Sequence, residues 1–473
     1  MFKNWYKTVQ TICILITPGS NSNSKCFYPE ILTVRVNSEI LTRTLCGNVL
    51  LFIRMKICNK VAFIQLIFNR YYSGSSATDK TSLFALRNLV NWRDVVSDAQ
   101  HNPAPCKRFV NLVLDANIIA AALTFFGMET TDDQPTKHSF NPELAVGLRV
   151  VRHRYFHRVV KEFIETYIVD GTLYENHFGN IQALQEWERA KTYEPVLPNG
   201  RYPCRFPGCE SSFKHDGVHR MRHELSHDPP PTIPEEPVLV NTVPDPTDQN
   251  PKPKDDVFDY HCGLMNMSLL LRNFMDAIKE GDGERIVRCI KMFLLHFKVD
   301  GGGSTKYALE ALYHLFQLFA LLSPREVERM KWNRTVNNHG RPGCNVAMDL
   351  ALEHDNHLLK DMIRGLGANV TEASVRRICM SFFIMKAFLE NLDLEMSVKK
   401  VSGEHCKKSV KQDLKKVVQT LQEQNVFEKQ ATREAMFSFP DCPRDYLQLV
   451  DAKTLFSWIN DHKRNVELGK RPR

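Results

Sequence analysis

Two cysteines and two histidines of this chain stand at the spacing C-x4-C-x13-H-x3-H, as Cys204, Cys209, His223 and His227. Two thiolates at a tight turn and two imidazoles one helical turn apart can converge on a tetrahedral zinc ion. A segment of about 25 residues has no adequate core of its own, so it would take its folding free energy from the metal. We therefore predict one structural zinc site, with no open position for catalysis.

The spacing is typical of a C2H2-type ββα zinc finger, with two departures. The interval from Cys209 to His223 is one residue longer than usual, and Arg220 stands where a core leucine is expected. Val218 or Met221 would then fill the core. Two further histidines are rival ligands at less usual intervals, namely His215 and His219.

Composition places the whole chain among folded globular proteins. It has 473 residues, 43% hydrophobic and 25% charged, which excludes collagen, a wholly disordered protein and a polytopic membrane protein. The apolar run from Val49 to Phe68 carries Arg54, Lys56 and Lys60, so we propose no transmembrane segment. Thirteen cysteines, an odd number spread over the chain, favour reduced thiols in the nucleus or cytoplasm.

Helical periodicity dominates on both sides of the motif, and a proline-rich stretch separates the two sides. Nine of the 24 prolines lie between Asp228 and Lys254, which predicts a semi-rigid linker. The predicted fold is mainly α, with helical domains flanking one small ββα finger. The predicted domains are an unassigned segment 1–55, a helical region 56–200, the finger 201–228, the linker 229–256 and a helical domain 257–473.

Several helices have predicted ends. One runs from 107 to 126 and stops at Gly127, and another covers 156–168. Further predicted signals are N-caps at Asp79, Asp282 and Ser323, the last with Pro324 at the first helical position, and a helix over 347–364 that ends at Gly365.

A second candidate metal site lies on the predicted helix 347–364. Asp349, Glu353 and His357 stand at i, i+4 and i+8, where they could hold Mg²⁺ or Mn²⁺ as the last acidic element of a two-metal nuclease. The alternative is a solvated polar helix face.

The net charge of +8 permits nucleic-acid binding without requiring it. The densest patch is Lys399–Lys416, whose seven lysines against Glu404 and Asp413 could follow a phosphate backbone or simply form a solvated helix face. The finger itself carries a balance of only +1, and a single finger reads about 3 base pairs. DNA and a protein partner therefore both remain open for the finger.

Several segments of the C-terminal half resemble a known family. They are Phe274–Arg285, Thr305–Leu312, Leu322–Pro324, Trp332–Val336 and Met348–His354. Together they resemble a multicopy domain of unknown function of invertebrate proteins that is often interrupted by one C2H2-like finger. The similarity extends from Lys56 to the C-terminus and includes Phe213–Gly217 and His223–His227.

The resemblance implies a transposon-derived protein with distant kinship to transposases that have an RNase H-like nuclease core. On that relationship Glu353, with Asp349, would take the place of the last catalytic acid. Family members usually extend further on the N-terminal side, whereas residues 1–55 do not match, so this chain would be a truncated or inactive copy.

The predicted function is therefore zinc-dependent binding to DNA or to a protein partner, in a transposon-derived context, by a binding protein rather than an enzyme. The alternative is a transposase-like, metal-dependent nuclease remnant that uses Glu353 and Asp349. The oligomeric state is left open.

Overall fold

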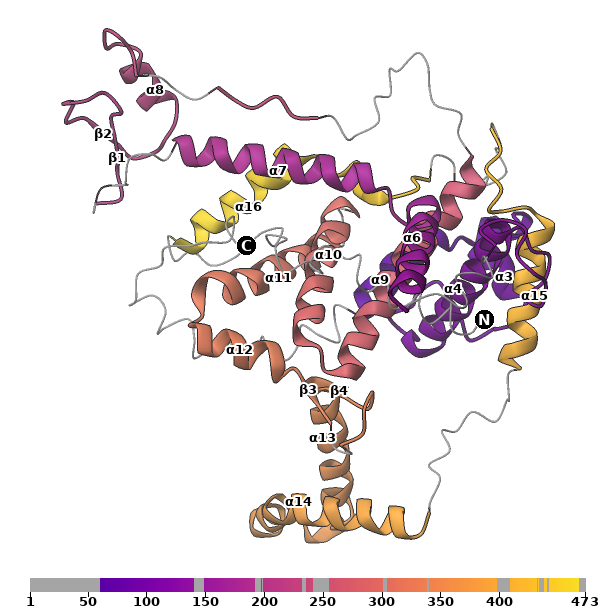
Figure 1. Ribbon diagram of the computed structural model, residues 1–473. Helices are drawn as coiled ribbons and strands as arrows, with labels where there is room; N and C mark the ends of the chain where they lie inside the picture. Colours follow the sequence, from indigo (N-terminus) through magenta and orange to yellow (C-terminus); the bar gives the residue numbers. More distant parts are fainter. Residues whose placement is uncertain are drawn as a thin grey trace. The chain divides into compact units, whose positions relative to one another are not determined.

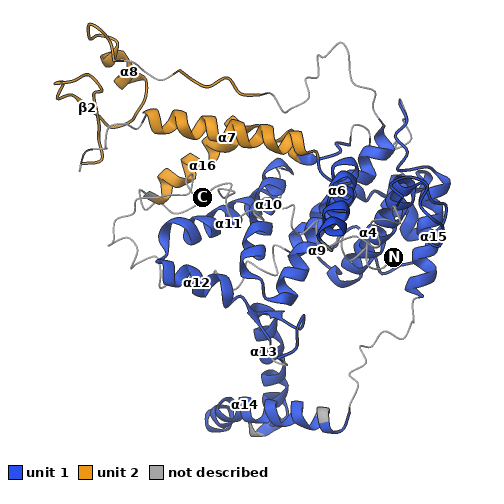
Figure 2. Ribbon diagram, viewed as in Figure 1, with its two compact units in different colours: residues 1–25, 34–169, 250–446 blue, residues 26–33, 170–249, 447–473 orange. Residues whose placement is uncertain are grey.

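The computed structural model describes residues 60–139, 149–191, 197, 199–231, 235–240, 255–300, 304–337, 340–397, 409–431, 433, 438–439 and 442–467. These residues are mainly helical, as predicted, with two short antiparallel strand pairs (Figure 1). The unassigned segment 1–55 and the lysines of 399–408 lie outside the described residues. The chain divides into two compact units (Figure 2).

Unit 1 takes residues 34–169 and 250–446, together with 1–25. After a helical segment at 60–71, its elements are η1 (Gly74–Thr78), α3 (Leu83–Leu89), α4 (Pro103–Phe126), α6 (Arg149–Tyr167), α9 (Asp256–Glu280), α10 (Gly283–Asp300), α11 (Thr305–Phe316), η3 (Gln317–Leu321), α12 (Pro324–Trp332), β3 (Thr335–Val336), β4 (Val346–Ala347), α13 (Met348–Arg364), η4 (Gly367–Asn369), α14 (Glu372–Glu395) and α15 (Val410–Glu423).

The core of unit 1 joins helices from both sides of the finger and the linker. Asn117 Oδ1 of α4 lies 2.8 Å from His261 Nδ1 of α9, and both side chains are buried. Phe63 stacks on Phe293 of α10 with ring centroids 4.1 Å apart. Residues more than a hundred positions apart thus complete one apolar core, which local periodicity does not reveal.

Helix α4 is long and apolar enough to span a membrane, and 72% of its most apolar window is buried inside the protein. Its buried residues include Phe109, Val113 and Ala121. Asp115 of α4 forms an ion pair with Arg272 of α9. These contacts are those of a core helix.

Most of the predicted helix ends are confirmed. Gly127 ends α4 in the left-handed region at φ 63°, and Gly365 follows α13. The side chain of Asp282 accepts from the backbone N–H of Arg285 at 2.9 Å. Ser323 forms a capping box with Glu326 at the start of α12.

Three predicted helix starts are wrong, and the first is that of α4, which begins at Pro103 instead of residue 107. The N-cap of α3 is Ser82, whose hydroxyl accepts from Ala85 N at 3.1 Å, whereas Asp79 follows η1. A turn closed by the hydrogen bond from Ser82 N–H to Asp79 O, at 2.8 Å, therefore occupies the place where a helix was expected to begin. Helix α6 starts at Arg149 instead of residue 156, because the polar residues of its first two turns hide the helical period.

Unit 2 contains the predicted finger, and its other elements are α7 (Gly171–Lys191), η5 (Tyr446–Leu449) and α16 (Ala452–Glu467). His177 Nε2 of α7 lies 2.8 Å from the Leu447 carbonyl oxygen. Asn180 holds the extended segment 235–240 through two hydrogen bonds to the backbone of Val240. The described part of the predicted linker has no helix or strand up to residue 240, and α9 begins at its end with Asp255 as N-cap.

Candidate metal centre

The two cysteines lie on the turn between two short strands. β1 (Tyr202–Pro203) pairs antiparallel with β2 (Ser212–Phe213), and Cys204 follows β1 directly. Cys204 N–H donates to Ser211 O at 2.9 Å, and Cys209 N–H donates to Phe206 O at 3.1 Å. Gly208 has φ 83°, a left-handed conformation that a side chain would strain, so this glycine lets the turn bring both thiols to one side.

The two histidines reach the same place from the following helix. α8 (Val218–Glu224) carries His223 in its last turn, whereas His227 lies beyond the helix end. Ser226 N–H donates to His223 O at 3.0 Å, and His227 N–H donates to Glu224 O at 3.3 Å. These tighter bonds replace the last helical turn, so the two imidazoles do not share one regular helix face as predicted.

The four ligand atoms of Cys204, Cys209, His223 and His227 all lie within 4.8 Å of one another. The two Nε2 atoms are 3.1 Å apart, and the contacts between Sγ and Nε2 are 3.2 Å for Cys209 with His223 and 3.4 Å for Cys204 with His227. Tetrahedral zinc with bonds of about 2.0 Å to nitrogen and about 2.3 Å to sulfur needs edges of roughly 3.3 and 3.5 Å. This group could therefore hold a metal ion.

The surroundings shift the pKa values of the two thiols in opposite directions. Hydrogen bonds from Ser211, and then from His223, lower the pKa of Cys209 to about 6. Burial raises the pKa of Cys204. Cys209 is thus prepared as a thiolate ligand, and a bound cation would have to displace the proton of Cys204.

Aromatic rings fix the orientation of both imidazoles. Phe206 stacks on His227 with centroids 4.3 Å apart and an interplanar angle of 5°. The Phe213 ring lies 5.2 Å from the ring of His223. Each ring restricts one imidazole, and in the folded module the Nε2 atoms lie beside the thiols.

Arg220 replaces the expected core leucine through a network of charges. Its side chain is 4% exposed, and its Nε lies 2.9 Å from Oε1 of Glu224, whose side chain is 0% exposed. Arg205 Nη1 lies 2.8 Å from the other Glu224 oxygen, and Arg220 also pairs with Asp216 at 3.3 Å. The small core of this segment therefore contains a compensated cluster of charge.

That network leaves the expected substitutes for the core leucine outside. Val218 is 60% exposed and Met221 48%, and Leu225, which was not among those substitutes, is also 60% exposed. At i, i+3 and i+7 they form one apolar stripe along α8 and the residue that follows it. His215 and His219 are exposed and stand apart from the four-ligand group.

The two acidic residues of the second candidate site differ in their exposure to solvent. Asp349 is 7% exposed and accepts from Leu350 N–H at 3.0 Å, whereas Glu353, one turn later, is exposed. His357 pairs with Asp361 at 2.9 Å. Within the part of the chain that the structure describes, Asp349 and Glu353 belong to no group of three potential metal ligands.

The structure describes the lysine-rich patch Lys399–Lys416 from residue 409 onward. α15 buries Val417 and Leu421 on one side, whereas Val410 is 53% exposed. Lys411, Lys415 and Lys416 are exposed.

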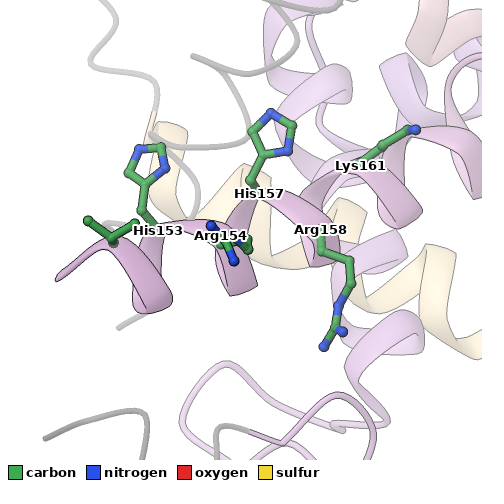
Figure 3. A pocket seen from close by; sticks show the side chains of 6 residues that line it. His153, Arg154, His157, Arg158 and Lys161 are labelled. Carbon is green, nitrogen blue, oxygen red and sulfur yellow. The ribbon is translucent and has the colours of Figure 1, made fainter. Parts of the chain in front are cut away.

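A basic face of helix α6 was not predicted from the sequence. The described residues that line the groove of Figure 3 all belong to α6, at positions 150, 153, 154, 157, 158 and 161. These positions repeat at helical spacing, so a search for periodic basic residues, in place of apolar ones, would have found them.

Residues 59–405 match a family of unknown function (DUF6589). No curated protein and no solved structure matches the chain.

Proposed function

The chain belongs to the DUF6589 family of unknown function, and we propose that it holds one structural zinc ion, which folds residues 201–228 into a ββα module for binding a protein partner. The observation that carries the proposal is the set of contacts of 3.1–3.4 Å among two Nε2 and two Sγ atoms, close to the edges of a zinc tetrahedron.

The donor set favours a structural ion over a catalytic one. Two thiolates and two imidazoles fill the four positions that zinc prefers, which leaves none for water or substrate. When bound, the ion supplies the cross-link that so short a segment lacks. The eight described cysteines form no disulfide, which supports a nuclear or cytoplasmic protein.

The outer face of α8 supports a protein partner over DNA. A finger reads base edges with polar side chains that project from its helix. Here Arg205 and Arg220 bind Glu224 within the module. The exposed stripe of Val218, Met221 and Leu225 offers apolar area, which is what a protein interface buries at its centre.

A pair of matched variants tests this proposal in the full chain. Val218→Ser with Leu225→Ser should abolish partner capture by cross-linking from cell extract, whereas Val238→Ser, at a valine 99% exposed outside the module, should not. Lys214→Gln with Arg222→Gln should leave binding to duplex DNA unchanged. If Lys214→Gln with Arg222→Gln loses DNA binding, and Val218→Ser with Leu225→Ser still captures the partner, the module binds DNA and not a protein.

A further inference from the structure

One face of α6 combines basic side chains with full access to solvent. His153, Arg154, His157, Arg158 and Lys161, the α6 basic face, are all exposed and line an open groove together with Val150. His153 and His157 project from the same edge of the helix, and Arg158 projects from the opposite edge (Figure 3). The sequence from Arg149 to Lys161 contains no acidic residue.

These cations are little neutralised by their surroundings. Lys161 pairs with Glu165 at 3.5 Å, with both side chains at least half exposed, and such a pair contributes little. Arg158 lies over the Tyr155 ring at 5.6 Å, which leaves its charge intact. Arg154 makes no ion pair with another described residue. The face therefore carries a positive potential that the described residues around it do not neutralise.

The opposite side of α6 is buried and fixes the helix in place. Val160 and Phe163 are 0% exposed, and the ring of Phe163 meets that of Phe125 of α4 with centroids 5.5 Å apart. The Tyr155 hydroxyl donates to His138 O at 2.9 Å. A basic amphipathic helix that binds membranes needs its apolar side free, and here the protein core takes that side.

We propose that the α6 basic face binds the phosphate backbone of a nucleic acid without reading its sequence. The face spans nine residues from His153 to Lys161, about 13 Å of helix axis, or about four phosphates along one DNA strand. Arginine forks match phosphate oxygens, and the pair Arg154 and Arg158 presents two of them one turn apart. This surface lies outside the zinc module, so the inference goes beyond the proposed function.

The test measures binding of the full chain to a 20-base-pair duplex and to a 20-nucleotide single strand over a series of salt concentrations. Three permanent charges predict a slope of log affinity against log salt of about −3 for the duplex. Arg154→Gln with Arg158→Gln should lower the affinity about tenfold and reduce the slope by about 2. Arg325→Gln with Arg329→Gln, exposed arginines at the same spacing on α12, should change neither.

Three results would overturn the proposal. They are the absence of duplex binding, an equal effect of the two arginine pairs, and equal or tighter binding of polyglutamate or of vesicles with anionic lipid through the same two arginines. Cys204→Ser should retain salt-dependent binding, because the α6 basic face does not contain the zinc ligands. Failure of the zinc proposal is thereby kept separate from failure of this one.

An independent feature of unit 1 is the apolar outer face of α14. Met380 is 75% exposed, Ile384 72%, Phe388 60% and Leu392 45%. The opposite face packs on α13, where Lys386 Nζ lies 2.6 Å from Asp355 and Phe382 is 5% exposed. Four large apolar side chains at successive helical turns are more than scattered surface hydrophobes.

The ends of this face carry opposite charge at symmetric distances. Exposed Arg377 precedes Met380 by three residues, and exposed Glu395 follows Leu392 by three. From Arg377 to Glu395 the intervals between consecutive members of this set are 3, 4, 4, 4 and 3 residues, the same in both directions. An antiparallel copy of the helix would thus place Arg377 against Glu395 and Met380 against Leu392, with Ile384 against Phe388.

We infer that α14 pairs with α14 of a second copy of this chain about a two-fold axis. An isologous interface must be complementary to itself, which the palindromic spacing and the opposite end charges both satisfy. Antiparallel helices also set opposite dipole ends side by side.

Sedimentation equilibrium of the full chain tests this second inference, with a dimer expected at micromolar concentration. Ile384→Asp should give a monomer, whereas Leu352→Asp, at an exposed leucine of α13, should not. Arg377→Glu and Glu395→Arg should each raise the dimer Kd roughly tenfold. The two changes combined should restore it. A monomeric native chain, or a double variant weaker than either single one, would overturn the pairing.

Discussion

The Sγ of Cys209 lies 3.2 Å from Nε2 of His223, which links the turn after β1 to the last turn of α8. A second contact, of 3.4 Å, joins Sγ of Cys204 to Nε2 of His227. Each contact thus pairs one cysteine with one histidine, in a segment with almost no apolar core. A metal ion at this point would join the turn after β1 to α8 and to the residues that follow it, so the ligands should control folding of the module.

Cys209→Ser should unfold residues 201–228 and leave unit 1 folded. Serine oxygen is a poor zinc ligand, and the module would lose most of its folding free energy with the metal. Hydrogen exchange should show loss of protection in α8 and unchanged protection in α4. Ser226→Ala, which alters a neighbouring hydroxyl outside the ligand group, is the control. Retained protection in α8 of Cys209→Ser would contradict the metal-dependent fold.

Glu224→Ala should destabilise the module more than Asp216→Ala. It leaves Arg220 buried without its closest carboxylate, and breaking a buried pair costs about 3–5 kcal/mol. Asp216 is an exposed residue whose side chain is 27% exposed, so its loss should cost about 1 kcal/mol or less. Zinc affinity, measured by competition with a chelator, reports the difference, since folding and metal binding are linked. Equal affinities for the two variants would contradict the role of the network.

The buried imidazole of His261 should make unit 1 less stable in mild acid. Burial, and then Arg433, lower the pKa of His261 to about 3, below the unfolded value of about 6.5. The unfolded chain therefore binds a proton that the folded chain refuses, and stability present above pH 6.5 is lost as the pH falls toward 3. Between pH 7 and pH 5 the loss from this group should be about 2 kcal/mol.

Urea unfolding at pH 7 and pH 5 measures this loss. In His261→Gln the difference between the two pH values should shrink by about 2 kcal/mol. His101→Gln should keep the full difference, because that side chain is 87% exposed. An unchanged pH dependence in His261→Gln would show that the imidazole does not stay neutral in the folded protein.

The nuclease alternative has its own measurement. We expect no strand nicking by the native chain in Mg²⁺ or Mn²⁺, because Asp349 is buried and Glu353 is exposed, with no third ligand beside them among the described residues. Activity above background that Glu353→Gln abolishes, and that Glu372→Gln at another exposed helix position does not, would establish the nuclease.

The sequence predicts well what local chemistry decides. The zinc ligand candidates follow from spacing, and the ends of α4, α12 and α13 follow from glycine and serine signals next to periodic apolar residues. The sequence does not separate Asp79 from Ser82 as the N-cap of α3, because both are good caps and only the turn between them, closed by Ser82 N–H to Asp79 O, distinguishes them.

What the sequence does not reveal depends on distant partners or on an unexpected residue type. The contact of Asn117 with His261 crosses 144 positions, so no local pattern contains it. Arg220 in a core position becomes intelligible only with Glu224 and Arg205 beside it. The α6 basic face is not evident from the sequence, because it begins before residue 156, where the predicted helix starts.

Zinc content of the purified full chain tests the central claim most directly. After dialysis against metal-free buffer, elemental analysis should give about one zinc per chain in the native protein and in Ser226→Ala, and almost none in Cys204→Ser or Cys209→Ser. A native stoichiometry far below one after refolding with excess zinc, or one zinc retained in both cysteine variants, would contradict a structural zinc at this group.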